Sequence, residues 1–201
     1  MPGPDLASIV TTAVTAPKLR LRTDVREPGW TFWELRTLNM HRVVGLLRED
    51  RPLSDAHALE TSIRGAVSRH FKRSWWRGMG FGVVAQVATL PLKADDLKTL
   101  VDVRENSKGT LQWVVLVARA TPRALGVHTW METYLSPAYR GILQGLGAAG
   151  YQVSSATRNK DGLMKVLTGI ADFEAALVSL GTRKQAFPEF HDDPQRKRAD
   201  A

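Results

Sequence analysis

The chain has 201 residues, of which 43% are hydrophobic and 24% charged, and it contains no cysteine. This length and composition are typical of one globular domain that buries its own core. The lack of cysteine excludes disulfides, thiolate zinc sites and a cysteine nucleophile, and no apolar run reaches the roughly 20 residues of a membrane span. Because the first residues show no export signal, we expect a cytoplasmic protein.

The chain is strongly basic. Its 28 lysine and arginine residues outnumber its 20 acidic residues, so the net charge is +8 and the pI is about 10.1. Such a charge favours polyanionic partners: nucleic acid, anionic lipid or an acidic protein. The alternative is a basic protein without a polyanionic partner, since net charge describes non-specific attraction and not fold.

The N-terminal segment is predicted to be a short helix followed by an extended stretch. Apolar residues recur at helical spacing over residues 5–15, and Asp5 precedes them as a plausible cap. Residues 18–26 alternate charged and apolar side chains, which predicts an edge strand or a linker.

Two longer helices are predicted next. Residues 31–48 show a mainly apolar face at helical spacing, and Thr31 and Glu34 match a capping box at its start. Residues 54–74 show the same periodicity, and their last turns are rich in arginine and lysine. Cations are favoured at the C-terminus of a helix, so this enrichment also has a purely structural explanation.

The second half of the chain is predicted to be mainly strands. Apolar alternation and turn residues place strands at 81–88, 111–118, 125–133, 151–156 and 163–167. Two helices are expected among them, at residues 136–149 and 171–180, the first ending at Gly150.

This order of elements predicts an α+β protein, with N-terminal helices followed by a largely antiparallel sheet whose helices pack on one face. We divide the chain into an N-terminal helix and linker at residues 1–27, a single α+β domain at 28–181, and a disordered tail at 182–201.

The strongest candidate site is a basic and aromatic segment where the second long helix meets the first buried strand. No acidic residue lies between Glu60 and Asp95, so positive charge is concentrated there. Cations neutralise phosphates, and flat aromatic rings stack on unpaired bases. The candidate nucleic-acid-binding residues are Arg64, Arg69, Lys72, Arg73, Trp75, Trp76 and Arg77. From this segment we expect a non-enzymatic protein that binds DNA or RNA, including single strands, with strong salt dependence and weak sequence preference.

Two other interpretations fit the same segment. Tryptophan and basic side chains also suit an anionic membrane surface, so a peripheral membrane or scaffold protein is the first alternative. Alternatively, the indoles pack in the core and the cations form a solvated face. The apolar segment at residues 6–14 and the edge strands also favour a homo-oligomer.

Gly145, Gly147 and Gly150 match the letters of a dinucleotide-binding fingerprint. That motif needs a strand before it and a helix after it, whereas here a helix precedes and a strand follows. We therefore interpret the glycines as a small-residue helix end that lets the helix lie close to the sheet, and we predict no cofactor.

His128, Trp130 and Glu132 alternate along a predicted strand and would project from one face. Histidine and glutamate could perform acid–base chemistry, which makes a small enzyme the second alternative function. No paired motif such as HExxH supports a metal site, and a surface or hydrogen-bonded histidine is the simpler interpretation.

Overall fold

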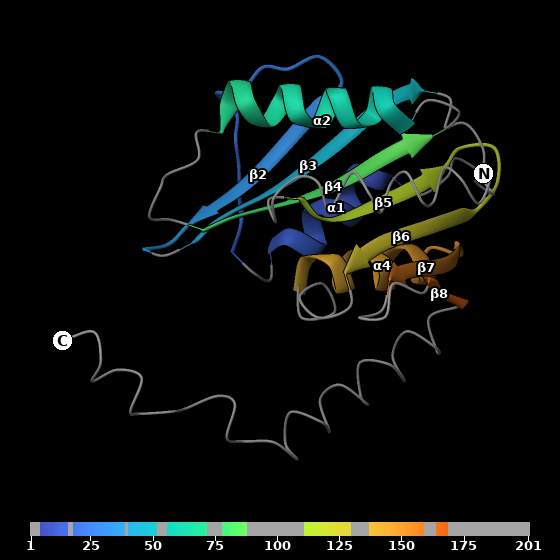
Figure 1. Cartoon of the computed structure of the whole chain (residues 1–201). Helices are drawn as coiled ribbons and strands as arrows, with labels where there is room; N and C mark the ends of the chain where they lie inside the picture. Colours follow the sequence, from blue (N-terminus) through green and yellow to red (C-terminus); the bar gives the residue numbers. More distant parts are fainter. Residues whose placement is uncertain are drawn as a thin grey trace.

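The computed structural model describes residues 5–15, 18–38, 40–51, 56–71, 78–87, 111–129, 137–158 and 164–168. Within these ranges the chain forms one eight-stranded sheet and three helices (Figure 1). The helices are α1 (Leu6–Thr15), α2 (Ala56–His70) and α4 (Pro137–Ala148). The strands are β1 (Arg20–Leu21), β2 (Trp30–Arg36), β3 (Met40–Arg51), β4 (Gly78–Val87), β5 (Leu111–Ala118), β6 (Arg123–Thr129), β7 (Gln152–Arg158) and β8 (Met164–Thr168).

The strands lie in the sheet in the same order as in the chain. The pairs β3–β4, β4–β5 and β6–β7 are parallel, and the other four neighbouring pairs are antiparallel. The prediction of an α+β fold is confirmed, and the sheet is mixed. Parallel pairs arise where a helix connects neighbouring strands, as α2 connects β3 to β4 and α4 connects β6 to β7.

The helices cover both faces of the sheet, so the prediction that they pack on one face is wrong. Apolar residues of α2 join one core cluster, whereas α1 and α4 share a second cluster on the opposite face (Figure 1). The direction of the strands explains this arrangement. Both crossovers advance in the same sense across the sheet, but β3 and β6 run in opposite directions, so right-handed crossovers place α2 and α4 on opposite faces.

The predicted helix over residues 31–48 is wrong, because β2 and β3 form an antiparallel hairpin there. The turn is closed by Thr37, whose backbone NH donates to the carbonyl of Met40 at 2.8 Å. Phe32 packs in the α2-side cluster and Trp33 in the other. Since both faces of the hairpin are buried, the apolar and polar alternation of a half-exposed strand is absent from the sequence.

Other predicted elements are confirmed with small shifts of their ends. The backbone NH of Ala7 donates to Asp5 Oδ1 at 3.1 Å, which is the expected cap of α1. Gly150 follows α4 with a φ of 87°, as a C-terminal glycine should. Of the predicted edge strand at 18–26, only the two residues of β1 are strand. The predicted helix at 171–180 and the tail at 182–201 lie outside the described residues, and the division into domains stays a prediction.

No helix in the described part of the chain has both the length and the apolar character that crossing a membrane requires.

Candidate nucleic-acid interface

The structure describes two of the seven predicted binding residues and the chain on either side of the other five. Arg64 and Arg69 lie in α2 with exposed side chains. Lys72, Arg73, Trp75, Trp76 and Arg77 lie outside the described residues. The described chain stops at Phe71, directly after α2, and resumes at Gly78, the first residue of β4. Gly78 pairs with Met40, the first residue of β3.

Phe71 fixes the end of α2 in the core. Its side chain is buried, and its ring meets that of Phe32 edge-on with centroids 5.1 Å apart. The rings of His41 and Phe81 lie 5.9 and 6.1 Å from it. Such edge-to-face and tilted contacts are the preferred geometry of aromatic pairs. The point where the basic segment begins is therefore held by strands β2, β3 and β4.

Arg22, in the stretch after β1, reaches the same place from the edge of the sheet. Its guanidinium lies 5.9 Å from the centre of the Phe71 ring, within cation–π range. It also donates to both carboxylate oxygens of Asp24 at 2.6 Å and contacts Glu34 Oε2 at 2.6 Å. The hydrogen bond from Arg22 lowers the pKa of Asp24 to about 2, and the same bond raises the pKa of Arg22.

Glu27 binds the last two residues of α2. The Arg69 guanidinium donates to both carboxylate oxygens, and Oε2 also lies 2.8 Å from His70 Nε2. Hydrogen bonding to Arg69, and then to His70, lowers the pKa of Glu27 below its usual range. The connection between β1 and β2 is thus tied to the helix end that precedes the basic segment.

Glu34 is the second carboxylate that gathers cations. Its Oε2 lies 3.0 Å from His41 Nε2 and 3.5 Å from an Arg36 guanidinium nitrogen, in addition to its contact with Arg22. His41 is buried, with 5% of its surface exposed. These two carboxylates and the ion pairs linked to them are called the charge cluster below. Its members are Arg22, Asp24, Glu27, Glu34, Arg36, His41, Arg69 and His70.

Two arginines on the same face as Glu34 offer exposed cations, Arg20 beside the charge cluster and Arg36 within it. Arg20 pairs in register with Glu34, so its side chain projects from the same face of the sheet. Arg36 follows on that face two residues after Glu34, and 53% of its side chain is exposed. Sequence reasoning placed Arg36 in a helix and therefore missed this group. The mixed charges of residues 20–36 were the available signal for a paired network.

The strand residues that flank the predicted basic turn at residues 158–165 lie toward the other edge of the sheet. Arg158 pairs with Thr129 and Met164 at the same end of the strands as Met40 and Gly78. Four strand spacings of about 4.8 Å separate β3 from β7, which puts the two groups roughly 19 Å apart. Arg22 and Glu27 of the early stretch therefore contact the end of α2, whereas the backbone of Arg158 lies several strands away.

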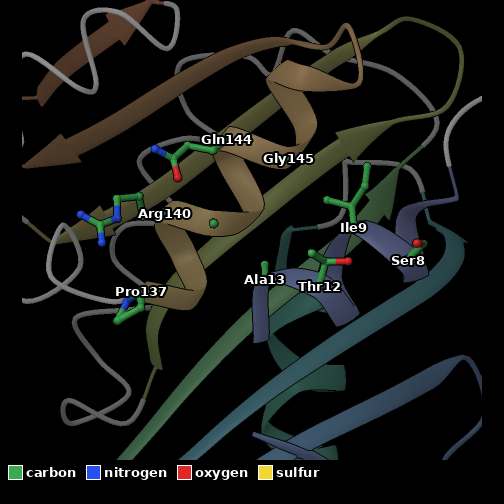
Figure 2. A pocket seen from close by; sticks show the side chains of 9 residues that line it. Ser8, Ile9, Thr12, Ala13, Pro137, Arg140, Gln144 and Gly145 are labelled. Atoms are coloured by element: carbon green, nitrogen blue, oxygen red, sulfur yellow. The ribbon is translucent and has the colours of Figure 1, made fainter. Parts of the chain in front are cut away.

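One glycine of the apparent dinucleotide fingerprint, Gly145, packs α4 against α1, as does Gly141 one turn earlier, whereas a Cβ at Gly150 would have nothing within 4 Å. A Cβ at Gly145 would approach Ile9 Cγ2 to 2.8 Å, and one at Gly141 would lie 3.1 Å from Ala13 Cβ. The small-residue helix end thus lies close to α1. A groove of about 440 Å³ lies between the helices, and Figure 2 shows the side chains that line it. Its lining is Ser8, Ile9, Thr12, Ala13, Pro137, Arg140, Gly141, Gln144 and Gly145.

His128 lies in the core, against the face covered by α4. Its side chain is fully buried, and its ring centre lies 5.4 Å from that of Tyr139. The Tyr139 hydroxyl in turn lies 3.2 Å from Ser155 Oγ. Trp130 and Glu132 lie outside the described residues. The interpretation of His128 as a surface histidine is therefore wrong, because both faces of this strand are covered.

Among the residues that the structure describes, no three histidine, aspartate or glutamate side chains come together as metal ligands. Comparison with protein-family models, curated proteins and solved structures finds no match for this chain.

Proposed function

We propose that the protein binds nucleic acid at the end of the sheet that surrounds Phe71. One observation supports this most: Arg22 over the Phe71 ring and Glu27 on Arg69 bring two basic stretches, far apart in the sequence, to one place. A polyanion needs several cations on one surface, and neither stretch alone supplies them.

The proposed phosphate contacts come from three sources. Arg20 and Arg36 are the exposed guanidiniums beside Glu34, and Arg64 is exposed on α2. To these we add Lys72, Arg73 and Arg77 from the sequence, with Trp75 or Trp76 stacking on exposed bases. Arg69 has a different role in this proposal, because its guanidinium is bound to Glu27 and holds the helix end in place.

The proposal includes a cytoplasmic location, where DNA or RNA is within reach. The anionic-membrane alternative uses the same cations and is separated from it by experiment. The enzyme alternative gains no support from His128, whose side chain does not reach solvent. Self-association stays a prediction from the sequence.

The test is a binding titration with fluorescent single-stranded DNA, duplex DNA and RNA at several salt concentrations. We expect log K to fall linearly with log salt, by about 0.7 for each phosphate contact on a single strand. The double variant Arg73→Ala with Arg77→Ala should bind more weakly and with a shallower slope. Its matched control, Arg123→Ala with Arg140→Ala, removes the same charge from exposed positions outside the cluster.

Two results would overturn the proposal. One is affinity that does not change with salt, or that weakens equally in the variant and its control. The other is sedimentation with phosphatidylserine vesicles in the absence of any binding to nucleic acid, which would favour the membrane alternative.

A further inference from the structure

The charge cluster contains two histidine–carboxylate pairs next to the proposed binding surface. His70 Nε2 lies 2.8 Å from Glu27 Oε2, and His41 Nε2 lies 3.0 Å from Glu34 Oε2. Both imidazoles are also held against aromatic rings, His70 at 6.3 Å from Phe32 and His41 at 5.9 Å from Phe71. The pairs are therefore fixed parts of the fold at the end of α2.

The charges facing each imidazole are known for the described residues. Glu27 faces His70, and the Arg69 guanidinium shares that carboxylate from the same turn of α2. Glu34 faces His41, and the guanidiniums of Arg22 and Arg36 contact the same Glu34 oxygen. Each pair carries one negative charge when its imidazole is neutral and no net charge when the imidazole is protonated. Because Arg69, Arg22 and Arg36 already offset the two carboxylates, protonation adds one positive charge to each pair.

Both positions tolerate the added proton. His70 is the last residue of α2, where the helix dipole favours a cation. A charged imidazole at either site keeps its hydrogen bond to a carboxylate, and such charge-assisted bonds are the stronger ones. The charge cluster can thus gain positive charge while the contacts around Phe71 persist.

We propose that acidification strengthens polyanion binding at this surface through protonation of His41 and His70. This inference rests on the proposed nucleic-acid-binding function and adds a form of regulation to it.

The experiment measures the affinity of the full chain for a mixed-sequence single-stranded DNA at about pH 8 and about pH 5.5, a range in which histidine side chains generally change charge. At the lower pH the wild type should bind more tightly, and its log K against log salt slope should steepen by about one. The double variant His41→Gln with His70→Gln should lose most of this difference. The control His191→Gln, in the C-terminal region, should keep it.

A second variant guards against misfolding, because His41 is buried. His70→Lys places a permanent cation at the more exposed position and should raise the affinity at about pH 8 while the pH dependence shrinks. The proposed regulation is wrong if the wild type binds DNA in a salt-dependent way but with equal affinity at both pH values. It is also wrong if the double glutamine variant keeps the full difference. In both cases the proposed binding function still stands. If the wild type binds DNA at neither pH, the proposed function itself fails.

Discussion

Glu27 and His70 are 43 positions apart in the chain, and their side chains meet at 2.8 Å. Arg69 donates to both oxygens of the same carboxylate, so one acidic residue between β1 and β2 holds the last turn of α2. The two contacts fix where the helix ends and where the basic segment begins. The charge cluster is thus a structural device first, and its function depends on the cations that it leaves exposed.

Replacing Glu27 with glutamine should destabilise the fold in a pH-dependent way. Bonding to Arg69 lowers the folded-state pKa of Glu27, so its stabilisation is present above the ordinary glutamate pKa of about 4.3 and is lost as the pH falls through the lower folded value. We expect a loss of about 1 kcal/mol near neutral pH, because the partners are partly exposed. Urea denaturation of both proteins near neutral pH and near pH 3 should show the difference shrinking in acid.

A matched control separates this effect from general acid destabilisation. Asp24→Asn removes a carboxylate whose pKa is also lowered, to about 2, by its bond to Arg22, but whose side chain is largely exposed. It should affect stability less than Glu27→Gln near neutral pH, since exposed ion pairs contribute little. An equal loss in the two variants would contradict the role given to Glu27.

Phe71→Ala should cost far more stability than substitution of an exposed apolar residue. The Phe71 ring is buried against three other rings, and truncation of a buried phenylalanine costs about 3–5 kcal/mol. Leu38→Ala is the comparison, since Leu38 is 77% exposed, and it should change stability by less than about 0.5 kcal/mol. Similar urea midpoints for the two variants would show that Phe71 does not fix the end of α2.

The hairpin of β2 and β3 shows why part of the fold escaped sequence reasoning. Leu35, Leu38 and Leu46 recur at helical spacing, yet Leu38 lies exposed in the turn while Leu46 is fully buried. Strands buried on both faces lack a period of two, so chance helical spacing outweighed the true pattern. The helix α1, by contrast, has a local cap and one buried stripe, and both signals are visible in its own ten residues.

The site was predictable only where charge is concentrated along the chain. The basic run between Glu60 and Asp95 is a local property of the sequence. The pairing of Glu27 with Arg69 and of Arg22 with Phe71 joins residues more than 40 positions apart, and it depends on the register of β1 on β2. No local pattern carries that information.

Gly82 and Gly145 lie so close to neighbouring side chains that replacing either with alanine should lower stability, and by different amounts. In Gly82→Ala the new Cβ would lie 2.1 Å from the buried Trp113 ring, which has little room to move. In Gly145→Ala it would meet the end of the Ile9 side chain at 2.8 Å, and Ile9 is only partly buried. We expect Gly82→Ala to cost about 3 kcal/mol or more and Gly145→Ala about 1 kcal/mol or less, measured as shifts of the urea midpoint. The reverse order would contradict the packing of β4 on β5.

The exposed arginines at the edge of the sheet provide the most direct functional prediction. Arg20→Ala with Arg36→Ala removes two cations from the proposed surface and leaves the Glu27 contacts to α2 intact. Because both side chains are exposed, stability should change by less than about 1 kcal/mol. Affinity for single-stranded DNA should fall, and the slope of log K against log salt should decrease by up to about 1.4, which corresponds to two phosphate contacts. The control with Arg123→Ala and Arg140→Ala lowers the net charge by the same amount. An equal decrease of affinity in both variants would show that only net charge matters, and that Arg20 and Arg36 do not belong to the interface.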